Sequence, residues 1–142
     1  MPAEEQINRY LESIPEPKKG DIRYLHAAIL EIAPGCRLWF VDGRDESGKV
    51  VSNPSIGYGV LRKKYADGKS KEFYQAGISA NSSGVTVYIM GLDDRKYLPS
   101  RYSESIGKAS VTGYCIKFKS LKDVDVEVLK EAIHDGIERT RA

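Results

Sequence analysis

Hydrophobic and polar residues alternate along residues 72–90, as they do in β-strands that bury one face. Polar residues and a glycine at positions 81–84 interrupt the alternation and predict the turn of a hairpin. If Ala80 pairs with Val85, one face of this hairpin is almost entirely apolar. That face carries Tyr74, Ala76, Ile78, Ala80, Val85, Val87 and Ile89. A shift of one residue would bring polar side chains among the aliphatic ones, so we predict the Ala80–Val85 pairing.

The other face of the predicted hairpin is mixed in character. It carries Phe73, Gln75, Gly77, Ser79, Thr86, Tyr88 and Met90. Gly77 opposite Tyr88 leaves room for the tyrosine ring to lie across the neighbouring strand. This mixed face is either a binding surface or dimer contact, or a second buried face covered by another part of the chain. The irregular segment 91–111 follows directly, and we expect it to fold back over the mixed face.

Apolar residues at helical spacing and short β-branched runs predict the remaining elements. The predicted helices are residues 3–14, residues 17–33 and a final helix capped by Asp123 or Asp125. The other predicted strands lie within residues 36–41, 50–51, 55–65 and 112–118. Together they predict a single domain over residues 1–142, of the α+β class. We expect an antiparallel sheet of about five strands, with two N-terminal helices and a C-terminal helix packed on it.

Charge and hydropathy argue against nucleic-acid and membrane partners. The chain has 22 basic and 20 acidic residues, a net charge of +2 and a mean hydropathy of -0.42. This balance does not favour a nucleic-acid partner, and the basic residues between positions 62 and 71 are interpreted as the solvated edge of a hairpin. No apolar run is long enough to span a membrane, and the first residues lack the layout of a signal peptide. We therefore expect a cytoplasmic protein without a membrane partner, with Cys36 and Cys115 as small core residues.

No catalytic motif is complete in the chain. The segment 107–110 resembles the end of a phosphate-binding loop, but neither Ser nor Thr follows Lys108. The final helix offers one further chemistry, because carboxylates suit hard cations, including iron. Its candidate metal ligands are Glu127, Glu131, Asp135 and Glu138. The same residues lie opposite the apolar stripe, where any amphipathic helix places charge.

Several blocks of the sequence resemble the YdhG-like family, a bacterial domain family of unknown function. They are PSIGYG, KKYADG, GVTVYIMG, Gly107-Lys108 and CIKFKSLKDVDVEVLKEAI, in that order. The resemblance runs from about Ile7 to Ile137. It implies an α+β domain with an antiparallel sheet and flanking helices, and no agreed activity. Some family members are linked to a frataxin-like role in handling iron, but no iron motif can be carried over residue by residue.

These observations favour a non-enzymatic domain that binds a small ligand or a partner protein on the mixed face, with a homodimer as one form of such a partner. The expected contact residues are Phe73, Gln75, Tyr88 and Met90, with Lys108 as an anion contact. Under this interpretation the cofactor is unknown. One alternative is a frataxin-like protein that binds iron through the carboxylates of the final helix. A second alternative is an uncharacterised enzyme.

Overall fold

The computed structural model describes residues 2–64 and 66–141. Within them the helices are α1 (Ala3–Ser13), α2 (Lys18–Ile32), α3 (Tyr97–Tyr102) and α4 (Val126–Arg139). The strands are β1 (Leu38–Val41), β2 (Ser55–Tyr58), β3 (Leu61–Lys64), β4 (Ser70–Phe73), β5 (Ala76–Asn81), β6 (Gly84–Ile89), β7 (Ser110–Val111) and β8 (Cys115–Phe118). Six of these strands form one antiparallel sheet in the order β1-β2-β5-β6-β8-β7, and β3 pairs with β4 in a separate ribbon. The predicted α+β class, with helices on an antiparallel sheet, is confirmed.

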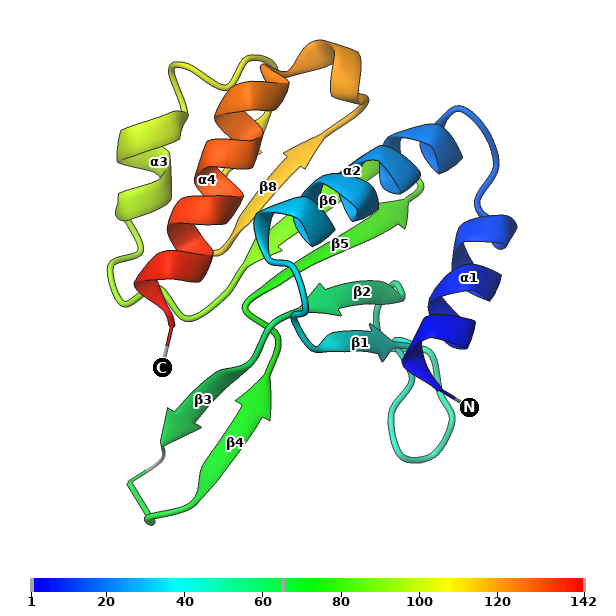
Figure 1. Cartoon of the computed structure of the whole chain (residues 1–142), viewed down its shortest axis with the longest axis vertical. Helices are drawn as coiled ribbons and strands as arrows, with labels where there is room; N and C mark the ends of the chain where they lie inside the picture. Colours follow the sequence, from blue (N-terminus) through cyan, green and yellow to red (C-terminus); the bar gives the residue numbers. More distant parts are fainter. Residues whose placement is uncertain (1, 65, 142) are drawn as a thin grey trace.

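The molecule has two layers. Helices α1, α2 and α4 lie on one side of the six-stranded sheet, and α3 stands beside α4 (Figure 1). The β3–β4 ribbon projects away from the sheet at its lower end (Figure 1). None of the described helices is both long enough and apolar enough to cross a membrane.

The predicted register of the central hairpin is confirmed. Ala80 lies opposite Val85 and Gly77 lies opposite Tyr88. All the aliphatic residues of the hairpin therefore face the helices. Strand β8 continues the sheet beyond β6, with Cys115 opposite Tyr88.

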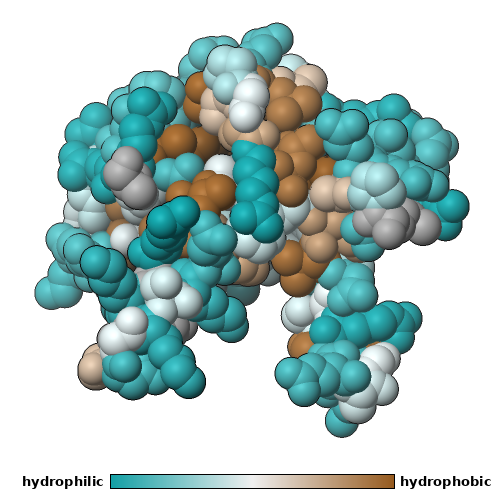
Figure 2. Space-filling model, turned by 60° about the horizontal axis from the view of Figure 1, so that its bottom comes forward, coloured by the Kyte–Doolittle hydropathy of each residue, from teal (hydrophilic) through white to brown (hydrophobic). Residues whose placement is uncertain are grey.

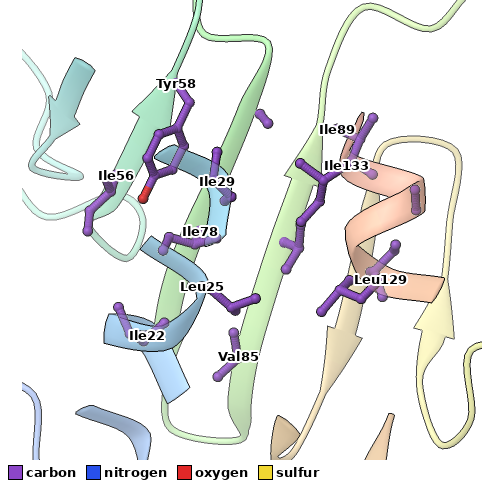
Figure 3. Close-up of a cluster of buried hydrophobic side chains, with 14 of the residues drawn as sticks. Ile22, Leu25, Ile29, Ile56, Tyr58, Ile78, Val85, Ile89, Leu129 and Ile133 are labelled. Atoms are coloured by element: carbon purple, nitrogen blue, oxygen red, sulfur yellow. The ribbon is translucent and has the colours of Figure 1, made fainter. Parts of the chain in front are cut away.

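The core lies between the sheet and the helices. Side chains of α2 and α4 point toward β5 and β6 (Figure 3). Ile78, Val87 and Ile89, from the predicted apolar face of the hairpin, belong to this one cluster together with Leu129 and Ile133 of α4. Helix α4 can approach β6 closely because residue 136 is a glycine. A Cβ at this position would collide with the Ile89 side chain. Asp125 is the N-cap of α4, since its Oδ1 accepts hydrogen bonds from the backbone N–H of Glu127 (3.1 Å) and Val128 (3.2 Å).

The predicted strand over residues 55–65 divides at Gly59. This glycine has a φ of +81°, and a Cβ there would collide with the Gln75 side chain. The positive φ turns the chain out of the sheet, because L side chains rarely adopt that conformation. Beyond the turn, β3 pairs with β4 in a two-stranded sheet of their own, so the ribbon leaves the six-stranded sheet as a separate arm.

Candidate functional site

The side of the six-stranded sheet opposite the helices is here called the open face. It contains most of the mixed face predicted from the hairpin. Its residues include Trp39, Val41, Ser55, Gly57, Gly77, Ser79, Thr86, Tyr88, Cys115 and Lys117. None of the helices in the described part of the chain covers this face (Figure 1). Antiparallel sheets commonly leave one face without helices, and such a face then carries polar and small residues. Here Ser55, Ser79, Thr86 and Cys115 are nonetheless buried, whereas Tyr88 is partly exposed and Lys117 is exposed.

Tyr74 covers the centre of the open face, which corrects its predicted place in the core. A Cβ on Gly77 would lie 2.7 Å from Cε1 and 2.8 Å from Cζ of Tyr74, and Gly57 has the same ring above it. The ring is 4% exposed, its hydroxyl lies 3.3 Å from Ser55 Oγ, and Phe73 stacks on it with ring centroids 4.0 Å apart. The paired glycines therefore form a floor that accepts an aromatic ring at van der Waals distance.

Gln75 also lies on the side opposite to the predicted one. Its Nε2 donates hydrogen bonds to the Ile137 carbonyl and to Thr140 Oγ1, both at 3.0 Å, at the C-terminal end of α4. The side chain is buried on the helix side of the sheet, so the structure does not bring Gln75 to the open face. The alternation predicted for residues 73–75 is wrong because the chain leaves regular strand geometry between β4 and β5.

The tyrosines of the open face are neutral hydrogen-bonding groups. Burial raises the pKa of Tyr74, and the hydrogen bond with Ser55 opposes that rise. Burial is also the main cause of the raised pKa of Tyr88, and the charges of Cys115 and Tyr114 raise it further. Each hydroxyl thus keeps its proton near neutral pH and is not set up for general-base chemistry.

A pocket of about 640 Å³ lies between the β3–β4 ribbon and residues 90–93, and we call it the hairpin pocket. Its apolar lining consists of Leu61, Phe73, Met90 and Leu92, and its charged lining consists of Arg62, Lys64, Lys71 and Asp93. Two predicted contact residues, Phe73 and Met90, therefore meet here. Figure 2 shows the ribbon, which forms one wall of this pocket, and the loop between β1 and β2 as two mostly hydrophilic projections. The arrangement of apolar lining and basic rim suits a ligand that has an apolar body and a negative charge.

A second, shallower hollow of about 500 Å³ lies at the other end of the open face, and we call it the lysine hollow. Lys108, Lys117 and Lys119 line it together with Asn81, Ser83, Thr86 and Ser110. All the charged groups among the described residues of this lining are basic. The lysine ion pairs found among the described residues involve Lys19 and Lys130 instead. The predicted anion contact Lys108 therefore lies with two further lysines that the sequence analysis did not single out.

Strand β6 connects the two hollows. Thr86 lines the lysine hollow, Met90 lines the hairpin pocket, and Tyr88 lies between them on the same face. Four residues of strand correspond to roughly 13 Å. Tyr88 is partly exposed and thus available to a ligand that extends along the strand.

The segment 91–111 does not cover the open face, contrary to our expectation. Helix α3 packs beside α4, where Asp135 Oδ2 accepts hydrogen bonds from the hydroxyls of Tyr97 and Tyr102. The segment reaches the ends of the open face only at the two hollows: residues 91–93 line the hairpin pocket and residues 108–110 line the lysine hollow. The segment thus completes the helix layer.

The carboxylates of α4 have partners of other kinds. Glu127 pairs with Lys130 and Glu131 with Arg101. Glu138 pairs with Arg141, and its Oε1 lies 3.9 Å from His134 Nε2. Asp135 bonds to Arg139 in addition to the two tyrosines. The described residues contain no group of three or more His, Cys, Asp or Glu that could hold a metal ion, so the iron-binding alternative stays a prediction.

One cluster on the helix side combines a thiol, a phenol and an imidazole. His26 Nδ1 lies 2.7 Å from the Tyr58 hydroxyl. The pKa of Tyr58 is raised mainly by burial and to a smaller extent by the charge of the nearby Cys36. Burial lowers the pKa of His26 and raises the pKa of the Cys36 thiol. A raised pKa favours the protonated thiol, which is the weaker nucleophile.

Comparisons with known proteins return no match: no family model fits the chain, and no curated protein or solved structure matches it. The resemblance to the YdhG-like family therefore stays a prediction.

Proposed function

We propose that this chain is a non-enzymatic binding protein whose ligand occupies the hairpin pocket and the adjoining open face. The observation that carries the proposal is the composition of that pocket. Phe73 and Met90 provide apolar surface, while Lys64 and Lys71 on the exposed ribbon provide positive charge. The ligand class is therefore a molecule with an apolar or aromatic body and an anionic group.

A ligand of this class gains from both parts of the pocket. Apolar surface that leaves water contributes about 25 cal/mol per Å². Arg62 is already engaged by Glu72, with Nε 3.3 Å from Oε2, so the lysines are the cations left for the ligand. Phe73 is held from two sides, by Tyr74 at 4.0 Å and by the edge of Trp39 at 6.0 Å between centroids, so the pocket wall is pre-organised.

Anilinonaphthalene sulfonate is a suitable probe, because it has an aromatic body and one negative charge. Its fluorescence should rise on binding to the folded protein. Lys71→Glu should weaken binding roughly tenfold, since it replaces an attraction at the rim with a repulsion. Lys122→Glu is the matched control, because it makes the same change of charge at an exposed position outside both hollows.

The proposal would be overturned if both variants bound the probe as tightly as the unmodified protein. Thermal melts of the three proteins are needed beside the titrations, because partly unfolded protein also binds this dye. Equal melting temperatures with different affinities locate the ligand at the hairpin pocket.

We also propose that the protein is cytoplasmic and that it belongs to the YdhG-like family. The two free cysteines, Cys36 and Cys115, support the location, since cytoplasmic thiols are kept reduced. The order of the quoted sequence blocks, together with the α+β fold, supports the family. A family model built to include divergent members would test that assignment.

A further inference from the structure

The net charge of +2 is the sum of a positive part of the chain, which contains strands β2 to β8, and a negative part, which contains the helices and β1. Residues 55–90 and 107–119, which contain β2 to β8, carry eight basic and two acidic residues. The remaining residues carry 14 basic and 18 acidic ones. The strand-bearing part is therefore strongly positive, while the part that contains the helices is negative. Net charge alone led us to expect no nucleic-acid partner, and this distribution changes that expectation.

The positive charge on the open face lies on both sides of aromatic residues. Lys117 is directly opposite Thr86, at the lysine hollow, and Tyr88 is two residues further along β6. Tyr114, 55% exposed, immediately precedes Cys115, which is the partner of Tyr88 across the sheet. Lys71 stands at the far end, at the hairpin pocket.

A small anion would fill one of the two hollows, whereas a chain with repeated negative charges can contact both at once. The hollows are separated by roughly 13 Å along β6. Single-stranded nucleic acids combine regularly spaced phosphates with bases that stack on aromatic side chains when they are not paired. A sheet face without a helix over it, on which exposed basic groups flank a partly exposed aromatic ring such as Tyr88, is one of the recurring surfaces for such strands.

We propose that the open face binds single-stranded nucleic acid, with phosphates at the lysine hollow and at the rim of the hairpin pocket, and with bases on Tyr88 between them. This inference rests on the proposed function, because it names the ligand class of the same surface. Base pairing would hide the bases from Tyr88, so duplex DNA is the weaker ligand.

The test is a fluorescence-anisotropy titration with a labelled single-stranded oligothymidylate at several potassium chloride concentrations. If three to five cations contact phosphates, the logarithm of the affinity should fall with the logarithm of salt with a slope of roughly -2 to -3.5. Lys117→Gln should reduce that slope by about 0.7, the value for one phosphate contact to a single strand. Lys122→Gln, outside both hollows, should leave affinity and slope unchanged.

The aromatic contact is tested with Tyr88→Leu, which keeps apolar bulk and removes the ring. Loss of one stacked base should weaken binding roughly tenfold. A melting temperature close to that of the unmodified protein shows that the variant is folded. Equal affinity of Tyr88→Leu and unmodified protein would overturn the role of stacking, and equal or tighter binding of the duplex would overturn the preference for single strands.

The dye titration separates this inference from the one on which it rests. If the hairpin pocket binds anilinonaphthalene sulfonate but the oligonucleotide does not bind, the nucleic-acid inference is wrong and the proposed function stands. If neither binds, both are wrong.

Discussion

The most informative single perturbation of the open face is Gly57→Ala. The added Cβ would lie 2.5 Å from Cγ and 2.7 Å from Cβ of Tyr74, whereas ordinary contacts begin at 3.4 Å. The ring would have to move by about 0.9 Å at Cγ to relieve the collision. It is held in place by the stacked Phe73 and by the hydroxyl contact with Ser55.

Overpacking of this kind costs about 1–3 kcal/mol. Alanine also removes the conformational penalty of glycine in a strand, which is worth about 0.5–1 kcal/mol. The expected net loss of stability is therefore up to about 2.5 kcal/mol, to be measured as a lower urea midpoint at an unchanged m-value. In a domain of this size, the melting temperature should fall by about 3 °C or more for each kcal/mol.

A double-mutant cycle with Tyr74→Ala identifies the cause. Without the ring, Gly57→Ala should become neutral or slightly stabilising, which gives an interaction energy of about 1–3 kcal/mol. A loss that is equal in both backgrounds would refute the reasoning, since the clash would then lie elsewhere. If Tyr74→Ala does not fold, Gly77→Ala provides an independent test, because its Cβ would meet the far side of the same ring at 2.7 Å.

Three further outcomes are expected. Gly20→Ala in α2 should raise stability by about 0.5–1 kcal/mol, because its Cβ would make only an ordinary contact at 3.6 Å; a loss in the urea midpoint would contradict the geometry. Burial acts to raise the pKa of Asp135, but hydrogen bonds from Tyr97, Tyr102 and Arg139 lower it overall. Its stabilising contribution is therefore present above the unfolded-state pKa of about 3.9 and is lost as the pH falls through the lower folded value, so the stability advantage over Asp135→Asn should shrink below about pH 4. An advantage that is independent of pH would contradict this linkage. Finally, calorimetric Fe(II) titration should give the same heat for the unmodified protein and for a Glu127→Gln/Glu131→Gln variant, and a loss of strong binding in the variant would instead favour the iron-binding alternative.

The central hairpin could be predicted because its sequence leaves one acceptable register. Ile78, Val87 and Ile89 share a face only if Ala80 pairs with Val85, and any shift would bury polar groups. Leu129 and Ile133, at helical spacing in α4, likewise lie together in the core. Periodicity reports burial reliably within an element whose backbone is regular.

Periodicity failed where the backbone departs from regular geometry. The positive φ of Gly59 and the irregular residues before β5 turn a segment that reads as continuous strand, which reverses the faces of Tyr74 and Gln75. The alternating glycines at 57 and 59 were the available signal, since glycines in strands mark close approach of other groups.

The candidate site was only partly predictable. Phe73 and Met90 do meet, but their pocket exists because the ribbon stands away from the sheet, and the glycines at 57 and 59 mark the turn without giving the direction of the ribbon. The three lysines of the lysine hollow come from two separate stretches of sequence, and strand pairing brings them together. The Tyr97–Asp135–Tyr102 contact likewise joins residues more than 30 positions apart.

The most direct test of the central claim, that the open face is the binding surface, is an amide chemical-shift titration with the oligothymidylate. The account predicts that the amide signals of Thr86, Tyr88, Met90 and Lys117 shift as the oligonucleotide is added. The amide signals on the outer side of α2 and α4 should stay in place. Shifts confined to the helices, with the signals of β6 and β8 unchanged, would contradict the account.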